Sequence, residues 1–265
     1  MLIVGELINS SKKSIRDALE NKDAAYILQV VKAQKEAGAT YIDINCGTLI
    51  EKEVPTIEWL AQLILSQTQL PLCIDSTNPL ALKAGLQKAT NGKTIINSIT
   101  DETTRFNAVL PLIKEYKAKV IALCIDNSGL PKTQADRIRI ADVLINKLVK
   151  EGIRLDDIYI DPLIKPIGID SKNGIEALQA IQNIMDGYPG VHTICGLTNI
   201  SYSLPSRKLL NRNFMVLASA KGMDSFILDP TDKDMRSSLI ATQALLGQDR
   251  FCRKYIKGFR EGLFE

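Results

Sequence analysis

The chain has 265 residues, of which 45% are hydrophobic and 24% are charged, and its formal net charge is +3 at pH 7. These values are ordinary for a globular protein, and acids and bases are interspersed without the basic stripe that nucleic-acid-binding proteins present. No apolar run is long enough to predict a transmembrane helix, and the N-terminal MLIVGELINSSKK lacks the basic start of a secretory signal. We therefore expect neither nucleic acid nor a membrane as partner.

Short apolar runs alternate with amphipathic helical patterns along the whole chain. The runs are rich in Ile, Val and Leu and predict strands buried on both faces, at residues 2–8, 41–45, 71–77, 93–98, 119–126, 158–164, 192–199 and 225–230. Apolar residues at three- and four-residue steps predict helices between the strands, at residues 23–39, 56–67, 78–89, 105–118, 135–152, 174–185 and 207–222. One or two further helices are expected from about residue 232 onward.

The alternation of strands and helices specifies a parallel sheet with right-handed crossovers. The chain length is typical of a closed (β/α)8 barrel, the TIM barrel. An open doubly wound sheet is the alternative, but the chain has no G-x-G-x-x-G and no G-x-x-x-x-G-K-[ST] loop. Because no Pro-, Ser- or Gly-rich linker interrupts the pattern, we predict an α/β fold in which residues 1–265 form a single TIM-barrel domain.

The cysteines and the single histidine restrict the chemistry. The five cysteines form no C-x-x-C pair, and Cys73, Cys124 and Cys195 lie in apolar runs, where a free thiol behaves as a small hydrophobe. The number of cysteines is odd and their spacing is not that of a disulfide framework. Both features favour a reducing compartment, so we expect a cytoplasmic protein. His192 lies in a predicted strand, so we expect a structural role for it. A His-rich metal site is excluded, and we predict no metal ligands.

Four predicted strands end on or beside a short amide or carboxylate, namely Asp75, Asn97, Asp161 and Asn199. The carboxyl ends of barrel strands meet at the face that holds the active site, so these four side chains are expected to line one pocket. Carboxylates accept hydrogen bonds and amides both donate and accept, which suits a flat heterocycle with N–H donors and ring-nitrogen acceptors. Capping of the following helix is the alternative at any single position.

Other residues at predicted strand ends are weaker candidates for the same pocket. Glu6 and Asn9 end the first strand and Asp43 lies in the second, where each either lines the pocket floor or anchors a loop. Gly196 precedes Asn199 and allows the backbone to approach a ligand closely. Arg207 begins a predicted helix and is a candidate for binding a carboxylate tail or a phosphate.

Taken together, these motifs resemble the methyltetrahydrofolate:corrinoid-protein methyltransferases and the folate-binding barrel of cobalamin-dependent methionine synthase. The resemblance runs from end to end and is carried by GELIN, DIN, CIDSTNP, INS, YIDPLI, GLTNISYS and GMDSFILDP, in this order. It implies an enzyme that moves a methyl group between N5 of 5-methyltetrahydrofolate and the cobalt of a corrinoid (cobalamin) carried by a partner protein. Tetrahydrofolate is the acceptor when the reaction runs in reverse. The resemblance also implies a homodimeric TIM barrel working in acetyl-CoA-pathway or demethylation metabolism.

The resemblance also implies roles for the polar residues. In the family, a carboxylate after strand three, an amide after strand four and a carboxylate after strand six hold the pterin. The matching residues here are Asp75, Asn97 and Asp161. The family asparagine after strand seven, here Asn199, is placed to hydrogen-bond to N5 of the pterin and is the candidate catalytic residue.

Further positions match the family less completely. Arg207 and Ile227 fall at positions near the family substrate, and we include both, with Gly196 and Asp43, among the expected substrate-binding residues. Tyr202 is a departure, because some close relatives carry glutamine there, whereas methionine synthases tend to have an aromatic residue. Any role of that glutamine therefore does not transfer to this chain.

Two alternative functions remain open from the sequence. Dihydropteroate synthase is a related pterin-binding barrel, but its T-P-D-S-F start, its Gly-rich loop after strand six and its C-terminal R-x-H motif are missing. The chain could also be a non-catalytic folate-binding module of a larger methyltransferase assembly. The D-x-H-x-x-G motif of cobalamin-binding domains is absent, so the corrinoid is expected to arrive on a partner.

Overall fold

Eight parallel strands form the centre of the computed structural model, which describes residues 1–89 and 93–264. The strands are β1 (Leu2–Asn9), β2 (Tyr41–Asn45), β3 (Leu72–Asp75), β4 (Ile95–Ile99), β5 (Lys119–Leu123), β6 (Ile158–Asp161), β7 (His192–Thr193) and β8 (Ser225–Leu228). They pair in the order β7-β6-β5-β4-β3-β2-β1-β8. A parallel bridge between Gly196 and Ile227 joins the two ends of this order. The predicted (β/α)8 barrel is confirmed.

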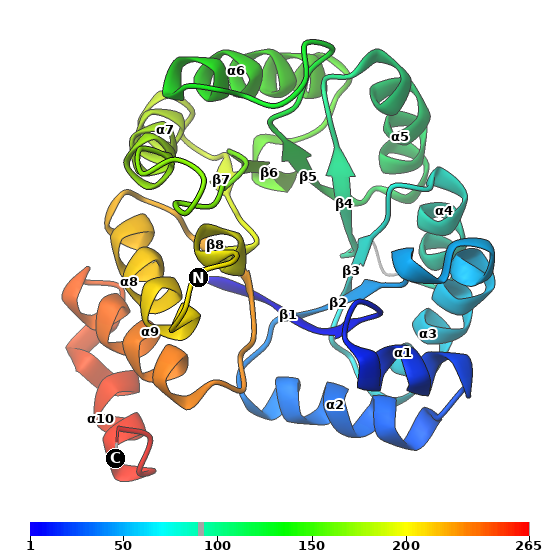
Figure 1. Ribbon diagram of the computed structural model, residues 1–265, viewed down its shortest axis with the longest axis horizontal. Coiled ribbons are helices and arrows are strands. Elements are labelled where there is room, and N and C mark those ends of the chain that lie inside the picture. The colour runs from blue at the N-terminus through cyan, green and yellow to red at the C-terminus, as the bar shows by residue number, and fades with distance from the viewer. Residues whose placement is uncertain (90–92, 265) are drawn as a thin grey trace.

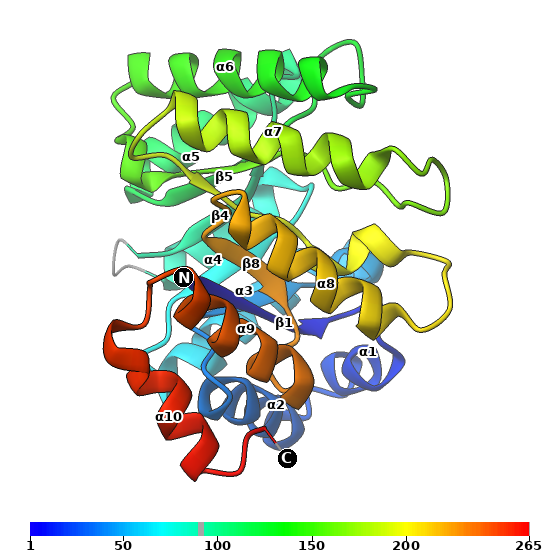
Figure 2. The same ribbon diagram turned by 90° about the vertical axis from the view of Figure 1, so that its left-hand side faces the viewer.

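The helices surround the strands as an outer ring, which Figure 1 shows in a view along the barrel. They are α1 (Lys13–Glu20), α2 (Ala24–Glu36), α3 (Glu53–Gln67), α4 (Pro79–Lys88), α5 (Thr103–Tyr116), α6 (Gln134–Lys150), α7 (Asn173–Gly187), α8 (Arg207–Ala220), α9 (Lys233–Leu245) and α10 (Arg253–Arg260). The last helix, α10, packs outside α9 at the periphery (Figures 1 and 2). Among the described residues, no helix combines the length and the apolar character needed to cross a membrane.

Two elements differ most from the sequence-based expectation; the strands predicted at residues 71–77, 119–126 and 158–164 also end two or three residues early, at Asp75, Leu123 and Asp161. The first helix, α1, was not predicted, because its sequence KSIRDALE is mostly polar and buries only Ile15, Ala18 and Leu19. The seventh strand is much shorter than predicted and ends at Thr193. The chain then enters a 3-10 helix, η3 (Leu197–Ser201), and Asn199 lies in this helix rather than on a strand.

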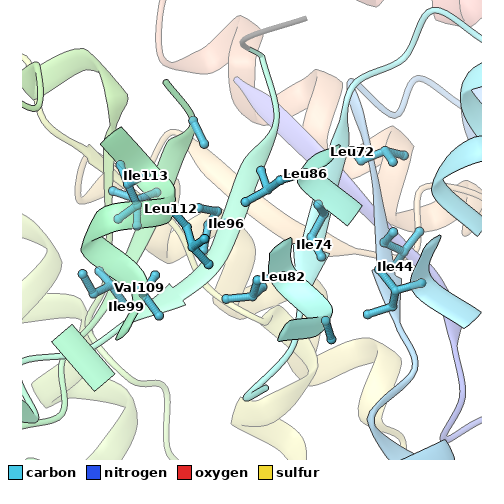
Figure 3. Close-up of a cluster of buried hydrophobic side chains, with 14 of the residues drawn as sticks. Ile44, Leu72, Ile74, Leu82, Leu86, Ile96, Ile99, Val109, Leu112 and Ile113 are labelled. Atoms are coloured by element: carbon cyan, nitrogen blue, oxygen red, sulfur yellow. The ribbon is translucent and has the colours of Figure 1, made fainter. Parts of the chain in front are cut away.

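Apolar side chains fill the space on both sides of the strands. The outer layer packs strands against helices, as Figure 3 shows for Ile74 of β3, Ile96 of β4, Leu82 and Leu86 of α4, and Val109 of α5. A second cluster fills the inside of the barrel with side chains contributed around the whole ring, namely Val4, Tyr41, Cys73, Ile95, Ile121, Tyr159, Ile194 and Ile227. This inner cluster closes the barrel, so a ligand can enter only above it, at the carboxyl ends of the strands.

The only histidine of the chain lies at the opposite, N-terminal face of the barrel. His192 Nδ1 is 2.5 Å from Asp224 Oδ2, and its Nε2 is 3.2 Å from Asp156 Oδ1. The ring also stacks on Tyr159, with 4.7 Å between ring centroids. The hydrogen bond with Asp224 raises the pKa of His192, and the bond with Asp156 adds to the effect. Both ring nitrogens face carboxylates, so the protonated imidazolium is the form that fits.

We predict that His192→Gln destabilises the protein more at pH 5.5 than at pH 8.5. A histidine whose pKa is raised on folding stabilises the folded state below its unfolded pKa of about 6.5, and this contribution disappears as pH rises through the folded pKa. The loss at pH 5.5 should be on the order of 1 kcal/mol, because the pair is partly exposed. Urea unfolding at both pH values measures it, and an equal loss at both would contradict the ion-pair role.

Candidate active site

One cavity of about 550 Å³ opens at the carboxyl ends of the strands, above the inner apolar cluster. Seven of the eight residues predicted for the site line this cavity, namely Asp43, Asp75, Asn97, Asp161, Gly196, Asn199 and Ile227. Arg207 is the exception, because it lines a smaller cavity of about 220 Å³. The two cavities share Glu6 and Thr198 and therefore adjoin each other.

The carboxylates of β2 and β3 form the first wall of the cavity. Asp43 is 2% exposed, and its Oδ1 atom has no hydrogen-bond partner among the described residues. Burial raises the pKa of Asp43 well above its usual value, and the neighbouring Asp75 raises it further. Asp75 accepts a 2.8 Å hydrogen bond from Asn45 Nδ2, yet burial still raises its pKa. A buried acceptor without a donor is costly, so this wall suits a ligand that brings N–H groups.

Arg105 of α5 joins the loop that follows β3 to strand β4. Its guanidinium donates hydrogen bonds to the carbonyl oxygens of Ser76 at 2.7 Å, Thr77 at 2.6 Å and Ser98 at 2.9 Å. Ser76 and Thr77 directly follow Asp75, and Ser98 directly follows Asn97 within β4; Asp75 and Asn97 are opposite each other in the strand register. Arg105 therefore fixes the spacing of two candidate pterin ligands, although its residue type alone did not predict this role.

Asp161 forms the wall at the end of β6. Its carboxylate accepts hydrogen bonds from the backbone N–H of Leu163, at 2.8 Å, and of Gly196. Burial nevertheless raises the pKa of Asp161 to about 7, because these two backbone bonds and the more distant Arg137 offset only part of the desolvation. Asp161 is therefore a weaker acid than an exposed aspartate because its carboxyl is buried.

Asn199 lies close to the Gly196 backbone, across the cavity from β3. Its backbone N–H donates a 3.2 Å hydrogen bond to the Gly196 carbonyl oxygen. A Cβ atom at Gly196 would lie 3.3 Å from Asn199 Nδ2, a tighter approach than side chains usually make. The absent side chain of Gly196 therefore leaves room for the Asn199 amide as well as for a ligand.

Glu6 enters the cavity through an irregularity in β1. Gly5 pairs with Ile42 and Ile8 with Ile44, so β1 has one more residue than β2 between these pairs, the mark of a β-bulge. The N–H of Leu7 in the bulge donates to Gln34 Oε1 of α2 at 3.0 Å. A Cβ at residue 5 would lie only 2.4 Å from that oxygen, so a larger residue there would push the Gln34 amide away from its bond to Leu7.

The Glu6 carboxyl itself has no hydrogen-bond partner among the described residues, although it lines both cavities. Burial raises the pKa of Glu6 to about 7, against the opposing charge of Lys12; the nearby Asp229 adds to the rise and Arg207 opposes it. Glu6 was considered from the sequence only as a possible floor or anchor residue. The structure places its carboxyl in the same cavity as Asn199.

Arg207 lies at the entrance rather than inside the main cavity. Its Nε donates to Ser201 Oγ at 3.2 Å and its Nη2 to the Thr198 carbonyl oxygen at 2.8 Å. Its guanidinium also lies 6.0 Å from the centre of the Tyr202 ring. Arg207 therefore supports the loop that carries Asn199 and remains exposed toward incoming ligands.

Comparison with known proteins agrees with this geometry. Residues 5–229 match the sequence profile of the family described as "Pterin binding enzyme". The chain belongs to this family. The predicted resemblance to pterin-binding barrels is therefore confirmed.

Two kinds of relatives are similar to this pterin-binding enzyme in sequence. It is 37% identical over 264 residues to the methylcorrinoid:tetrahydrofolate methyltransferase of Eubacterium limosum, covering 99% of this chain and 97% of that protein. It is 32% identical over 241 residues to the methionine synthase of Mycobacterium tuberculosis, covering 86% of this chain but only 20% of that protein. The chain thus corresponds to a whole protein in one case and to one part of a larger protein in the other.

Solved structures show the same fold at low sequence identity. The dihydropteroate synthase of Xanthomonas albilineans superposes with a TM-score of 0.70 at 18% identity, covering 93% of this chain and 92% of that chain. The dihydropteroate synthase of Yersinia pestis gives a TM-score of 0.67 at 14% identity, covering 93% of this chain and 94% of that chain. At these identities the likeness concerns the fold alone.

We predict that Asp161→Asn stabilises the pterin-binding enzyme at pH 8 while weakening its dependence on pH. A carboxyl whose folded pKa lies above its unfolded value favours the folded state at low pH, and this advantage disappears as pH rises from about 4 to about 7. Removing the buried charge should raise the free energy of unfolding at pH 8 by up to about 4 kcal/mol. Chemical unfolding from pH 4 to pH 8 measures the effect.

The matched control for this prediction is Asp186→Asn, at an exposed aspartate of α7. This control should follow the wild-type profile across the pH range. A stability profile of Asp161→Asn that also parallels the wild type would contradict a strongly desolvated Asp161.

Proposed function

We propose that the protein is a methyltransferase that moves a methyl group between N5 of tetrahydrofolate and the cobalt of a corrinoid carried by a partner protein. The observation that carries the proposal is the 37% identity, over nearly the full length of both chains, to a protein named methylcorrinoid:tetrahydrofolate methyltransferase. The cavity supports it, because it places Asp75, Asn97, Asp161 and Asn199 around one opening.

In this proposal, Asp75, Asn97 and Asp161 hold the pterin ring. Carboxylates accept hydrogen bonds from the ring amino and N–H groups, and the amide of Asn97 can both donate and accept. The same residues fix the direction in which N5 faces the opening, and such orientation can lower the barrier by several kcal/mol. Asp43, Gly196 and Ile227 line the same cavity and complete the binding surface, whereas Arg207 at the entrance faces the folate tail.

The proposed reaction is a displacement at the methyl carbon. In the direction that the name of the Eubacterium limosum relative gives, N5 forms the new bond to carbon, the carbon–cobalt bond breaks with its electron pair remaining on cobalt, and N5 loses a proton. In reverse, N5 leaves carbon and regains the proton. Asn199 can donate a hydrogen bond to N5 as electron density builds there, without itself titrating.

A proton must therefore reach or leave N5 near neutral pH. Glu6 and Asp161 line the cavity and have pKa values of about 7, raised by burial, which is close to the best value for exchanging protons at that pH. Both groups are thus suited to exchange this proton, directly or through water. The corrinoid is a substrate delivered from outside, and the described residues contain no cluster of His, Cys, Asp and Glu arranged to hold a metal ion.

Asn199→Ala tests the catalytic role. We expect kcat to fall by on the order of 10²–10³, the usual loss when one preorganised donor is removed, while folate affinity changes less. The measurement follows cobalamin absorbance during methyl transfer between tetrahydrofolate and free methylcobalamin, and titration measures folate binding. Asn146→Ala, at an exposed amide of α6, is the matched control and should retain wild-type kcat.

The two alternatives predict other results in the same assay. A wild-type protein that binds folate tightly but never changes the cobalamin spectrum would be a folate-binding module. Condensation of a hydroxymethylpterin pyrophosphate with p-aminobenzoate would identify a dihydropteroate synthase activity. An Asn199→Ala variant with unchanged kcat would remove Asn199 from the mechanism.

We further propose that the chain acts in the cytoplasm as a homodimer and as one functional domain, with no nucleic-acid or membrane partner. Its five cysteines are all free, which suits a reducing compartment. Leu209, Val216 and Leu217 are exposed on α8 and offer an apolar face for a second copy.

Light scattering should give twice the chain mass, and Leu209→Asp/Leu217→Asp should give the monomer. A wild-type monomer at micromolar concentration would refute the dimer.

A further inference from the structure

Large apolar side chains are exposed in the segments that follow five of the eight strands at the cavity face. We call Ile50, Leu80, Leu130, Ile169 and Tyr202 the rim ring, because they follow β2, β3, β5, β6 and β7 respectively. Each is between 58% and 77% exposed. In Figure 2, where β1 points to the right, the loops joined to α6, α7 and α8 protrude on that same side. The rim ring therefore covers five of the eight strand-to-helix connections around the opening that leads to the polar residues of the site, and none of its members follows β1, β4 or β8 in the described chain.

Single exposed apolar residues are normal on any protein and need no explanation. Here, however, they recur around one opening, whereas most other exposed large apolar residues of the described chain lie on α8 or in the segment from the end of α9 through α10. Ile50 is also held at φ 46° and ψ −99°, which is strained for a β-branched residue. Strain of this kind persists where a surface serves a function.

The charged residues of the same loops are mainly basic. The exposed basic side chains are Lys52, Lys132, Lys172, Arg207 and Lys208, and the exposed acidic ones are only Glu51 and Asp170. These counts cover the segments that follow the five strands, residues 46–52, 76–80, 124–133, 162–173 and 196–208. An opposite surface that meets this rim should therefore be acidic at its edge and apolar where it touches the rim ring. Such charges mainly speed association, while desolvated apolar contacts provide the affinity.

We propose that the rim ring is the docking surface for the corrinoid-carrying protein, whose contact face is apolar with an acidic margin. The inference rests on the proposed methyl transfer. That reaction requires the methyl carbon to lie near 3 Å from N5 inside the cavity, so the partner must cover the opening. Apolar contacts on these five sides of the opening would then help to exclude water from the polar site.

The test compares a protein substrate with a small one. Leu80→Ser/Ile169→Ser removes two members of the rim ring without adding charge, and both residues are surface-exposed and lie outside the cavity. Methyl transfer is measured with tetrahydrofolate and either free methylcobalamin or the methylated corrinoid protein purified from the cells that make this chain. We expect KM for the corrinoid protein to rise about tenfold or more, with unchanged kinetics toward free methylcobalamin.

Leu245→Ser is the matched control, because Leu245 is 85% exposed at the far end of α9. It should leave both reactions unchanged. Raising salt should increase KM for the corrinoid protein and leave free methylcobalamin unaffected, since the rim is basic.

Three outcomes would overturn the docking surface: unchanged KM for the corrinoid protein in the double variant, equal losses with both substrates, or a wild type that uses only free methylcobalamin. A wild type that uses neither substrate would instead refute the proposed function, and the docking surface with it.

Discussion

Desolvation of carboxyl groups above a filled apolar floor is the constraint on which the site depends. The inner cluster, from Val4 to Ile227, fills the barrel beneath the cavity with apolar side chains. Asp75 and Asp161 end their strands above this floor, Asp43 and Glu6 lie within β2 and β1, and burial raises the pKa values of all four carboxyl groups. A ligand rich in N–H groups relieves this cost, which explains why an apolar barrel can bind a polar heterocycle selectively.

Much of the fold and part of the site followed from the sequence, because both rest on local patterns. Ile-rich runs in the sequence predict buried strands. A polar residue at the end of such a run must face either the barrel mouth or the next helix. Asp75, Asn97 and Asp161 were therefore predicted to line one pocket without any knowledge of contacts, and they do line one cavity. Asn199 was found through its motif, although its strand ends six residues earlier than expected and a 3-10 helix carries it.

What the sequence did not reveal depends on contacts between distant residues. Gln34 stabilises the β1 bulge from a helix 27 residues away, and Arg105 joins the loop after β3 to strand β4 through backbone carbonyls. No spacing of residues along the sequence predicts the role of Gln34 or that of Arg105. The short polar helix α1 escaped detection because it buries only three side chains. Distant contacts of this kind set the precise position of Glu6 and Asp75, so chemistry at these residues required the three-dimensional structure.

The most direct measurement is calorimetric titration of tetrahydrofolate at pH 6.5 in buffers of different ionisation enthalpy. Pterin N–H groups should favour the ionised carboxylates, so binding should release protons, up to about one for a group with a pKa near 7 such as Asp161. Proton release should fall in Asp161→Asn. Tight binding without proton release, or no binding, would contradict the claim that desolvated carboxyl groups bind the reduced pterin.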